Sequence, residues 1–248
     1  MLTITSRSNS LIKDIANLHD AKHRAEEQLF IAEGLRTCST LLSTGITCTH
    51  ILYTHAASEH IQTLSHEAAA ILVSDDVMKK ISTMSSPSGI LGVFNIPQQQ
   101  DKPITTPGLV LLDISDPGNM GTLIRTAAAV NAQTVVVIEG CDPWSPKVVQ
   151  ASAGTIGMVA IKKWSWDKLI ENKNEHQLYA LVVKDGTSIQ EISLDKGLLV
   201  IGNEARGIPD DLLADCERKV TLSMPGGTES LNAAVAGSIA LYMGCVKI

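Results

Sequence analysis

Glycines and polar side chains follow an apolar stretch near the C-terminus of the chain. The stretch spans residues 198–201 and is followed by Gly202, Asn203, Glu204 and Gly207. Glycines let a backbone come close to a ligand, and a carboxylate among them can accept hydrogen bonds or hold a loop. Because parallel strands bring their carboxyl ends to one edge of a sheet, the pattern predicts a ligand site at strand ends.

A second apolar stretch, 220–222, repeats this arrangement. It runs into a turn that contains Met224, and after the turn Ser230 and Asn232 open an alanine-rich stretch, 230–245. Serine and asparagine are favoured N-cap residues, so both are predicted to cap a last helix. For Ser230, a simple cap and a functional contact explain the sequence equally well.

Arg125 lies among apolar residues on a predicted helix, 119–130, that carries almost no other charge. Arginine is rarely buried unless it is paired or functional, so Arg125 is a candidate for chemistry. Asn119 stands at the start of the same helix, after a predicted buried strand at 109–114. Its simplest interpretation is a helix cap, and its alternative is a contact within the predicted site.

The same region is compatible with a dinucleotide-binding fold, and hence with a nucleotide-dependent oxidoreductase. A strand, a glycine turn, a helix, a second strand and then Glu139 follow each other in that fold's order. However, the glycines are spaced GxxG rather than GxGxxG, and an arginine on the helix has no part in that scheme. This hypothesis is therefore the less favoured one.

The elements that position these residues form two regions of the chain. Residues 109–248 alternate helices with apolar, non-alternating strands, which predicts a parallel sheet covered on both faces. Residues 1–96 predict a small α/β domain, and the proline- and glutamine-rich residues 97–108 predict a linker. The expected helices are 8–20, 35–43, 57–69, 75–81, 119–130, 145–153, 166–172, 209–214 and 230–245. The expected strands are 30–32, 51–53, 71–73, 90–94, 109–114, 134–138, 158–161, 178–183, 198–201 and 220–222.

Composition limits the class of protein. The 248 residues are 44% hydrophobic, enough for a sizeable core, and the net charge of −6 excludes a basic coat over the whole surface. Five scattered cysteines without a CxxC pair favour reduced thiols in a cytoplasmic protein and argue against a zinc site. No metal is expected. No signal core is present at the N-terminus, and the long uncharged run within 230–246 is too weakly apolar to predict a membrane span.

Together, these patterns resemble the SpoU (TrmH-like) family of RNA ribose 2′-O-methyltransferases, within the SPOUT superfamily. The family's three motifs correspond, in order, to Asp116, Pro117, Asn119, Gly121, Arg125, Thr126 and Ala127; to Gly202, Glu204 and Gly207; and to Leu222, Met224, Gly226, Ser230, Leu231 and Asn232. The resemblance implies a C-terminal α/β trefoil-knot (SPOUT) domain over 109–248. It also implies an L30e-like RNA-binding domain over 1–96.

The resemblance further implies S-adenosylmethionine as the cofactor. The residues expected to bind it are Leu181, Val182, Gly202, Asn203, Gly207, Leu222, Met224, Leu231 and Asn232. The residues expected to take part in methyl transfer are Arg125, Asn119, Glu204, Ser230 and Asn232.

The roles of these catalytic residues stay open at this point. The family casts Arg125 as the general base, but deprotonating an ordinary guanidinium near pH 7 costs roughly 7–9 kcal/mol. A charged Arg125 that stabilises the alkoxide or clamps a phosphate is the alternative. Asn119 is expected to orient the ribose or Arg125, and Glu204 to pair with Arg125 or to hold a loop.

Ribosomal RNA is the favoured substrate by resemblance, with transfer RNA and a non-catalytic RNA-binding protein as alternatives. Arg7, Lys13 and Arg24 are the expected RNA contacts, although acidic residues interleave with them and a solvated helix face is equally compatible. The small residues of the last helix permit close packing, and the resemblance implies a homodimer in which one subunit can complete the site of the other.

Overall fold

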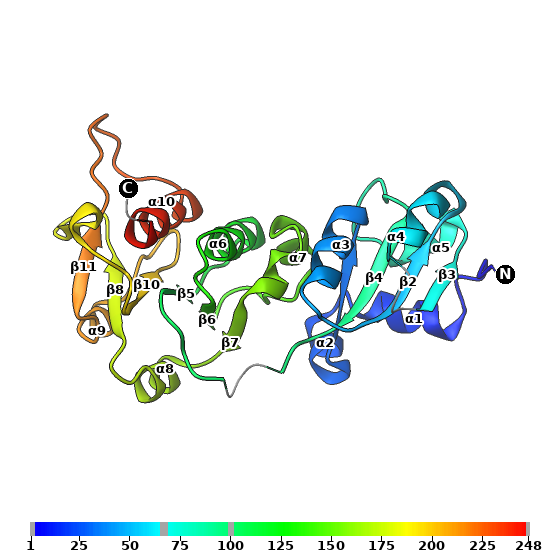
Figure 1. Ribbon diagram of the computed structural model, residues 1–248, viewed down its shortest axis with the longest axis horizontal. Helices are drawn as coiled ribbons and strands as arrows, with labels where there is room; N and C mark the ends of the chain where they lie inside the picture. The colour runs from blue at the N-terminus through cyan, green and yellow to red at the C-terminus, as the bar shows by residue number, and fades with distance from the viewer. Residues whose placement is uncertain (1–2, 65–68, 99–101, 247–248) are drawn as a thin grey trace. The chain divides into compact units, whose positions relative to one another are not determined.

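The computed structural model describes residues 3–64, 69–98 and 102–246 of the chain. These residues form two compact units (Figure 1). Unit 1 contains the described residues up to Pro97 together with Trp144–Gly157. Unit 2 contains those of Gln98–Pro143 and those from Met158 onward. The sequence predicted a single boundary at 97–108, with residues 144–157 in the C-terminal domain. In the structure this segment belongs to unit 1 instead.

Unit 1 is built on a four-stranded mixed sheet. Its strand order is β1-β4-β2-β3; β4 is antiparallel to both of its neighbours, whereas β2 and β3 are parallel. The strands are β1 (Leu29–Glu33), β2 (Cys48–Tyr53), β3 (Ala69–Leu72) and β4 (Ile90–Asn95). The helices are α1 (Ser10–Asn17), α2 (Ala21–Glu27), α3 (Leu35–Ser43), α4 (Ile61–Leu64), α5 (Asp75–Ile81) and α7 (Pro146–Ala151), with the 3₁₀ helix η1 (His55–His60).

Helices α1 and α5 pack together with the sheet because each has an apolar face. Ile12 and Ile15 of α1 share a core with Val77 and Ile81 of α5 and with Leu52 of β2. The spacings of three and four residues place each pair on one side of its helix. These local patterns are the ones from which the helices were predicted.

The segment Trp144–Gly157 belongs to unit 1 for reasons of packing. The indole ring of Trp144 lies 4.9 Å from the ring of Phe30 on β1. Gly154 has φ +82°, and a Cβ there would lie 2.6 Å from the carbonyl oxygen of Thr37. Contacts between residues more than a hundred positions apart leave no periodic signal in the sequence.

Unit 2 is built on a seven-stranded sheet in which every pair of neighbouring strands is parallel. The strand order is β7-β6-β5-β10-β8-β11-β9. The strands are β5 (Gly108–Leu112), β6 (Thr134–Ile138), β7 (Ala160–Lys163), β8 (Gln177–Leu181), β9 (Thr187–Ser188), β10 (Gly197–Ile201) and β11 (Arg218–Thr221).

Helices cover both faces of this sheet. In Figure 1, α6 (Pro117–Ala129) and α10 (Ala233–Cys245) lie above the strands, and α8 (Trp166–Asn172) and α9 (Asp210–Leu213) lie below them. Two short 3₁₀ helices, η2 (Thr155–Met158) and η3 (Ile189–Glu191), complete the described elements. The prediction of a parallel sheet covered on both faces is confirmed.

Several expected segments differ from the structure. The helix expected at 8–20 is the shorter α1, and α2 follows it as a separate helix that was not expected. The helix expected at 57–69 is η1 followed by α4, with 65–68 outside the described residues. The last helix begins at Ala233 rather than at 230. Residues 99–101 of the expected linker lie outside the described residues, and Ile104 within it is buried in the core of unit 2.

None of the helices in the described part of the chain is long and apolar enough to cross a bilayer.

Candidate active site

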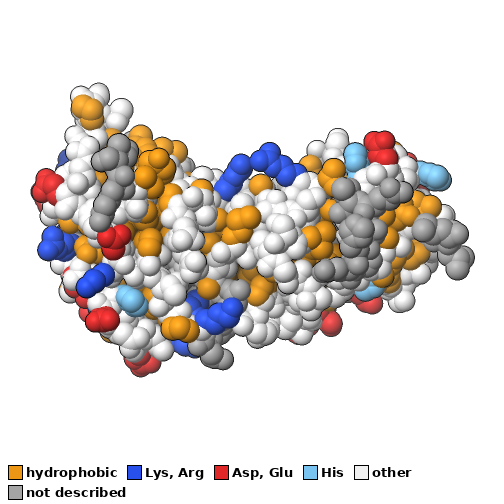
Figure 2. Space-filling view, viewed as in Figure 1, with side chains coloured by type: hydrophobic (Ala, Val, Ile, Leu, Met, Phe, Trp, Pro, Cys, Tyr) orange, Lys and Arg blue, Asp and Glu red, His pale blue; other side chains and the backbone are white. Residues whose placement is uncertain are grey.

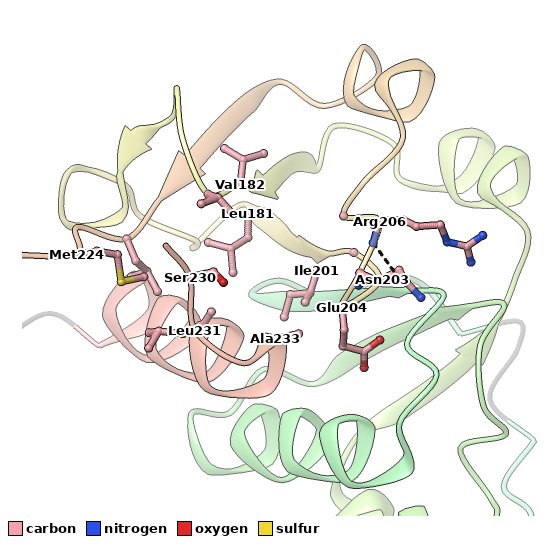
Figure 3. Close-up of a pocket in the computed structure, with 16 residues that line it drawn as sticks. Leu181, Val182, Ile201, Asn203, Glu204, Arg206, Met224, Ser230, Leu231 and Ala233 are labelled. Carbon is pink, nitrogen blue, oxygen red and sulfur yellow. Dashed lines mark hydrogen bonds between the residues drawn. The ribbon is translucent and has the colours of Figure 1, made fainter. Parts of the chain in front are cut away.

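A pocket of about 430 Å³ opens in unit 2 at the carboxyl ends of β8, β10 and β11 (Figure 3). Its wall contains eight of the residues expected to bind the cofactor: Leu181, Val182, Gly202, Asn203, Gly207, Leu222, Met224 and Leu231. The two polar turns singled out in the sequence therefore meet around one cavity. We call this cavity the β10 pocket.

Gly202 shapes the floor of the β10 pocket. A Cβ at this position would lie 2.5 Å from the backbone carbon and oxygen of Gly207, closer than atoms can approach. Gly207 itself has φ +69°, in the left-handed region that favours glycine. Both glycines are therefore required by the tight loop 202–207, whose two ends come within van der Waals contact.

Asn203 holds that loop in place from within. Its Oδ1 accepts hydrogen bonds from the backbone N–H groups of Ala205, at 2.9 Å, and Arg206, at 3.1 Å. Its Nδ2 donates to the carbonyl oxygen of Asp113 at 2.9 Å, and the guanidinium of Arg206 forms an ion pair with the Asp113 carboxylate. The loop is thereby tied to the end of β5, and the structure assigns Asn203 a clear role in positioning it.

A chain of hydrogen bonds connects three of the expected catalytic residues beside the pocket. The Nδ2 of Asn119 donates to Oε1 of Glu204 at 2.9 Å, and the Nδ2 of Asn232 donates to Oδ1 of Asn119 at 3.1 Å. Helix α6 presents Asn119 because Asp116 caps it and accepts from the Asn119 N–H at 2.7 Å. Segments 85 and 113 residues from Asn119 thus meet at its amide.

The carboxylate of Glu204 is held in its ionised form. Partial burial raises the pKa of this group, but hydrogen bonds from the Asn119 side chain and from backbone N–H groups, including those of Ser115 and Asp116, outweigh burial. The net result is a pKa below the ordinary value of 4.5. Glu204 is therefore an acceptor of hydrogen bonds at neutral pH, with no proton to donate.

Of the two roles expected for Glu204, pairing with Arg125 does not occur among the described residues of this chain. Arg125 is exposed on α6, and within the described residues its guanidinium has no hydrogen bond or ion pair. The sequence suggested that Arg125 is buried, because its neighbours along the chain are apolar. Those neighbours lie on the inward side of the helix, whereas Arg125 lies on the outward side. Arg125 does not line the β10 pocket of its own chain.

The two expected caps of the last helix behave differently. Asn232 is the N-cap of α10, and its Oδ1 accepts from the N–H groups of Ala234, at 2.9 Å, and Val235, at 3.3 Å. Ser230 is exposed, precedes the helix and lines the β10 pocket. The expectation that Ser230 caps the helix is therefore wrong. Asn232, expected also at the cofactor, is not part of the pocket wall.

The three expected RNA contacts in unit 1 separate into two kinds. Arg7 and Lys13 are exposed, and the carbonyl oxygen of Arg7 accepts a hydrogen bond from Nζ of Lys80 at 2.7 Å. Arg24 is only 3% exposed, and its guanidinium donates to the carbonyl oxygens of Leu18 at 2.8 Å and His19 at 2.9 Å. Arg24 therefore stabilises the C-terminal end of α1, and its assignment as an RNA contact is wrong.

Several residues of the pocket wall were not expected from the sequence. They are Val183, Ile201, Ala205, Arg206, Ala233 and Ala236. Ile201 and Arg206 flank expected positions, so their neighbourhood in the chain could have indicated them. Ala233 and Ala236 reach the pocket because α10 starts beside it, which no local pattern shows. Among the described residues, no group of three or more histidine, cysteine, aspartate or glutamate side chains is placed to hold a metal ion.

Comparisons with known proteins cover nearly the whole chain. Residues 107–242 match the model of the SpoU rRNA Methylase family, and residues 9–92 match the MRM3-like substrate binding domain. An uncharacterized tRNA/rRNA methyltransferase of Synechocystis is 31% identical over 252 residues, covering 97% of this chain and 92% of that protein. A 23S rRNA guanosine 2′-O-methyltransferase of Bacillus subtilis is 27% identical over 98% of both chains.

The solved structures agree with the sequence matches. An AdoMet-bound rRNA methyltransferase from Sinorhizobium meliloti has a TM-score of 0.85 at 26% identity, covering 98% of this chain and 97% of that one. The expected fold class, a SPOUT methyltransferase domain with a parallel sheet behind a small α/β domain, is confirmed by this likeness. Because the family model matches more than half of the chain and the β10 pocket lies within the match, the chain belongs to the SpoU rRNA methylase family.

Proposed function

We propose that this protein transfers the methyl group of S-adenosylmethionine to a ribose 2′-hydroxyl of ribosomal RNA. The observation that carries the proposal is the β10 pocket, with the Asn119–Glu204 hydrogen bond beside it, inside the region that matches the SpoU family. Two of the relatives named above, those of Bacillus subtilis and Sinorhizobium meliloti, act on ribosomal RNA by their names, and this favours ribosomal over transfer RNA.

The β10 pocket suits S-adenosylmethionine. Leu181, Leu222 and Leu231 provide apolar walls for its adenine and methionine portions, and Gly202 permits the close backbone approach to Gly207 that shapes the loop beside them. When bound, the cofactor supplies an electrophilic methyl group on a sulfonium ion. A cationic sulfur is stabilised by a nearby anion, and Glu204 is the ionised carboxylate of the pocket wall.

Two tasks remain for the residues beside the pocket. The 2′-hydroxyl must be held in line with the methyl group while its proton leaves to water, and the charge that develops on its oxygen must be stabilised. Asn119, fixed by Glu204 and Asn232, is placed to orient the ribose. A charged guanidinium suits the second task, and we assign it to Arg125, acting as an electrostatic clamp.

Arg125 is exposed and does not line the pocket of its own chain, so we propose that it serves the pocket of a partner subunit in a homodimer. Helix α10 supports this arrangement. Val235, Ile239 and Tyr242 are 46%, 40% and 49% exposed and lie along one side of the helix. Figure 2 shows hydrophobic side chains gathered in the part of unit 2 where α10 lies in Figure 1. Such an apolar stripe suits a two-fold interface.

RNA binding is assigned to unit 1, which matches a substrate binding domain. Arg7 and Lys13 are its exposed cations among the expected contacts, and Lys80 joins them through its hydrogen bond to Arg7. Contacts to phosphates by such side chains weaken steeply with salt. We further place the protein in the cytoplasm, where thiols stay reduced; the five cysteines, all free, are compatible with that compartment.

Two measurements test the proposed function. Calorimetric titration should detect binding of S-adenosylmethionine and none of NAD, which separates a methyltransferase from the oxidoreductase alternative. Incubation with radiolabelled S-adenosylmethionine and bulk RNA should label ribosomal RNA at a 2′-O-methyl ribose, located by alkaline-hydrolysis mapping. Binding of RNA without methyl transfer would favour the non-catalytic alternative, and labelling of transfer RNA alone would replace the substrate.

A further inference from the structure

A second pocket lies in unit 2, at the carboxyl ends of four neighbouring strands. Its volume is about 610 Å³, and its wall includes the residues that directly follow β5, β6 and β7, namely Asp113, Glu139 and Trp164. Asn203, just beyond β10, completes this edge. The chain winds from β5 to β6 and β7 in one direction and places β10 and β8 on the other side. In open parallel sheets, ligands bind at such a switch point.

The second pocket is distinct from the β10 pocket but shares one wall with it. Asn203, Arg206 and Gly207 line both cavities. The loop that forms the floor of the methyl-donor site is therefore also one side of the second pocket. A group bound in the second pocket would contact that loop directly.

One carboxylate in this pocket has no partner in the described part of the chain. Glu139 is exposed and has no hydrogen bond or ion pair within the described residues, whereas the carboxylate of Asp113 is neutralised by Arg206. The turn that carries Glu139 is rigid: its φ is +57°, and a Cβ on Gly140 would lie 2.4 Å from the carbonyl oxygen of Ile114. The N–H of Cys141 donates to the same oxygen at 2.9 Å.

Most of the remaining wall is apolar, with two aromatic side chains. Trp164 and Trp166 line the pocket and are each 8% exposed. Leu112, Ile138 and Leu212 add aliphatic surface. An apolar cleft with a few fixed polar groups is the usual form of a site for a small planar molecule.

We propose that the second pocket binds an unpaired guanine base of the RNA substrate, with Glu139 reading the base. Guanine presents two adjacent donors, N1–H and N2–H, which match the two oxygens of one ionised carboxylate. Adenine, cytosine and uracil each lack this pair of neighbouring donors. Proteins read RNA in this way on the exposed edges of unpaired bases. The inference rests on the proposed function, because that function makes RNA the ligand.

The test uses the full chain and its own fluorescence. Two of the three tryptophans line the second pocket, and the third, Trp144, lies in unit 1. In a Trp144→Phe background, guanosine 5′-monophosphate should change the emission saturably and bind about tenfold more tightly than the adenosine, cytidine and uridine monophosphates. Calorimetry on the unsubstituted chain repeats the measurement without the Trp144→Phe change.

Glu139→Gln is the decisive variant, because an amide offers one acceptor and places a donor against the donors of guanine. Its affinity for guanosine 5′-monophosphate should fall about tenfold. Glu171→Gln, on the exposed side of α8 and outside the pocket wall, is the matched control and should bind like the unsubstituted chain. Both variants should keep their affinity for S-adenosylmethionine, since neither residue lines the β10 pocket.

Three results would overturn the inference: equal affinities for the four nucleotides, unchanged guanosine 5′-monophosphate binding in Glu139→Gln, or displacement of that nucleotide by S-adenosylmethionine. The proposed function stands or fails separately. Methyl transfer without guanine binding would overturn only the second pocket, and guanine binding without methyl transfer would overturn only the activity.

Discussion

At the scale of single residues, Arg125 gives the clearest test, because its replacement should lower kcat without changing the stability of the fold. Its side chain is exposed and has no partner within the described residues, so Arg125→Ala should leave the free energy of unfolding and S-adenosylmethionine binding unchanged. If the guanidinium stabilises the developing alkoxide, kcat should fall by about 10²–10³-fold. Steady-state assays with ribosomal RNA measure this.

Arg218→Ala, which removes another exposed arginine of unit 2 outside the pocket wall, should keep its kcat. Normal turnover in Arg125→Ala would remove Arg125 from the mechanism.

Glu204 allows a prediction about pH. Its pKa lies below 4.5 because hydrogen bonds, that of Asn119 among them, outweigh partial burial. A group whose pKa is lowered by folding stabilises the folded state above its unfolded value, and this contribution is lost as the pH falls through the folded value. In Asn119→Ala, the Glu204 pKa should therefore rise, which a carboxyl ¹³C NMR titration measures. Identical midpoints in the two proteins would show that Asn119 does not hold the carboxylate.

At the scale of elements, the loop 202–207 decides the shape of the β10 pocket. A Cβ on Gly202 would collide with backbone atoms of Gly207, which cannot move aside as a side chain can. Gly202→Ala should therefore destabilise the fold by about 1–3 kcal/mol and displace the pocket floor. Affinity for S-adenosylmethionine should fall about tenfold or more, by calorimetric titration.

Gly226→Ala is the matched control for this element. A Cβ there meets no atom within 4 Å, and its backbone is not in the left-handed region. It should melt and bind S-adenosylmethionine like the unsubstituted chain. An equal loss of affinity in both variants would mean that the two turns are simply sensitive to any substitution, and that the contact between Gly202 and Gly207 is unimportant.

At the scale of the whole molecule, the exposed stripe of α10 predicts a dimer. Ile239→Glu places a charge in the middle of that stripe and should convert dimers to monomers, because an unpaired charge in an apolar interface is costly. Sedimentation or light scattering measures the mass. Met84→Glu introduces the same charge at an exposed methionine of unit 1 and should leave the dimer intact. A monomeric unsubstituted chain would contradict the interface.

Mixed dimers test whether Arg125 acts across that interface. Arg125→Ala and Glu204→Gln subunits should each form nearly inactive homodimers. In a mixed dimer, one site regains both an intact arginine and an intact carboxylate if Arg125 serves the partner. Up to about half of normal activity should then return in the isolated mixed dimer, by methyl-transfer assay. No recovery would place Arg125 and Glu204 at the site of one and the same chain.

The sequence by itself determined the local features of this protein. The parallel sheet, most helices and the glycine-containing turns at 202–207 and 222–227 follow from apolar periodicity and from the backbone freedom of glycine. The gathering of the two polar turns at one sheet edge was predictable because the residues after buried parallel strands must lie together there, whereas most individual residues of the β10 pocket wall were expected from the family resemblance.

Only the tertiary structure decided which side chains meet. Asn119 contacts Glu204 and Asn232 across 85 and 113 residues, Arg24 is buried against backbone carbonyls, and Arg125 is exposed without a partner among the described residues. The second pocket at Glu139 depends likewise on loops from four strands. Such contacts arise from packing between distant segments, and periodicity reports only the side of an element on which a residue lies, not what lies opposite it.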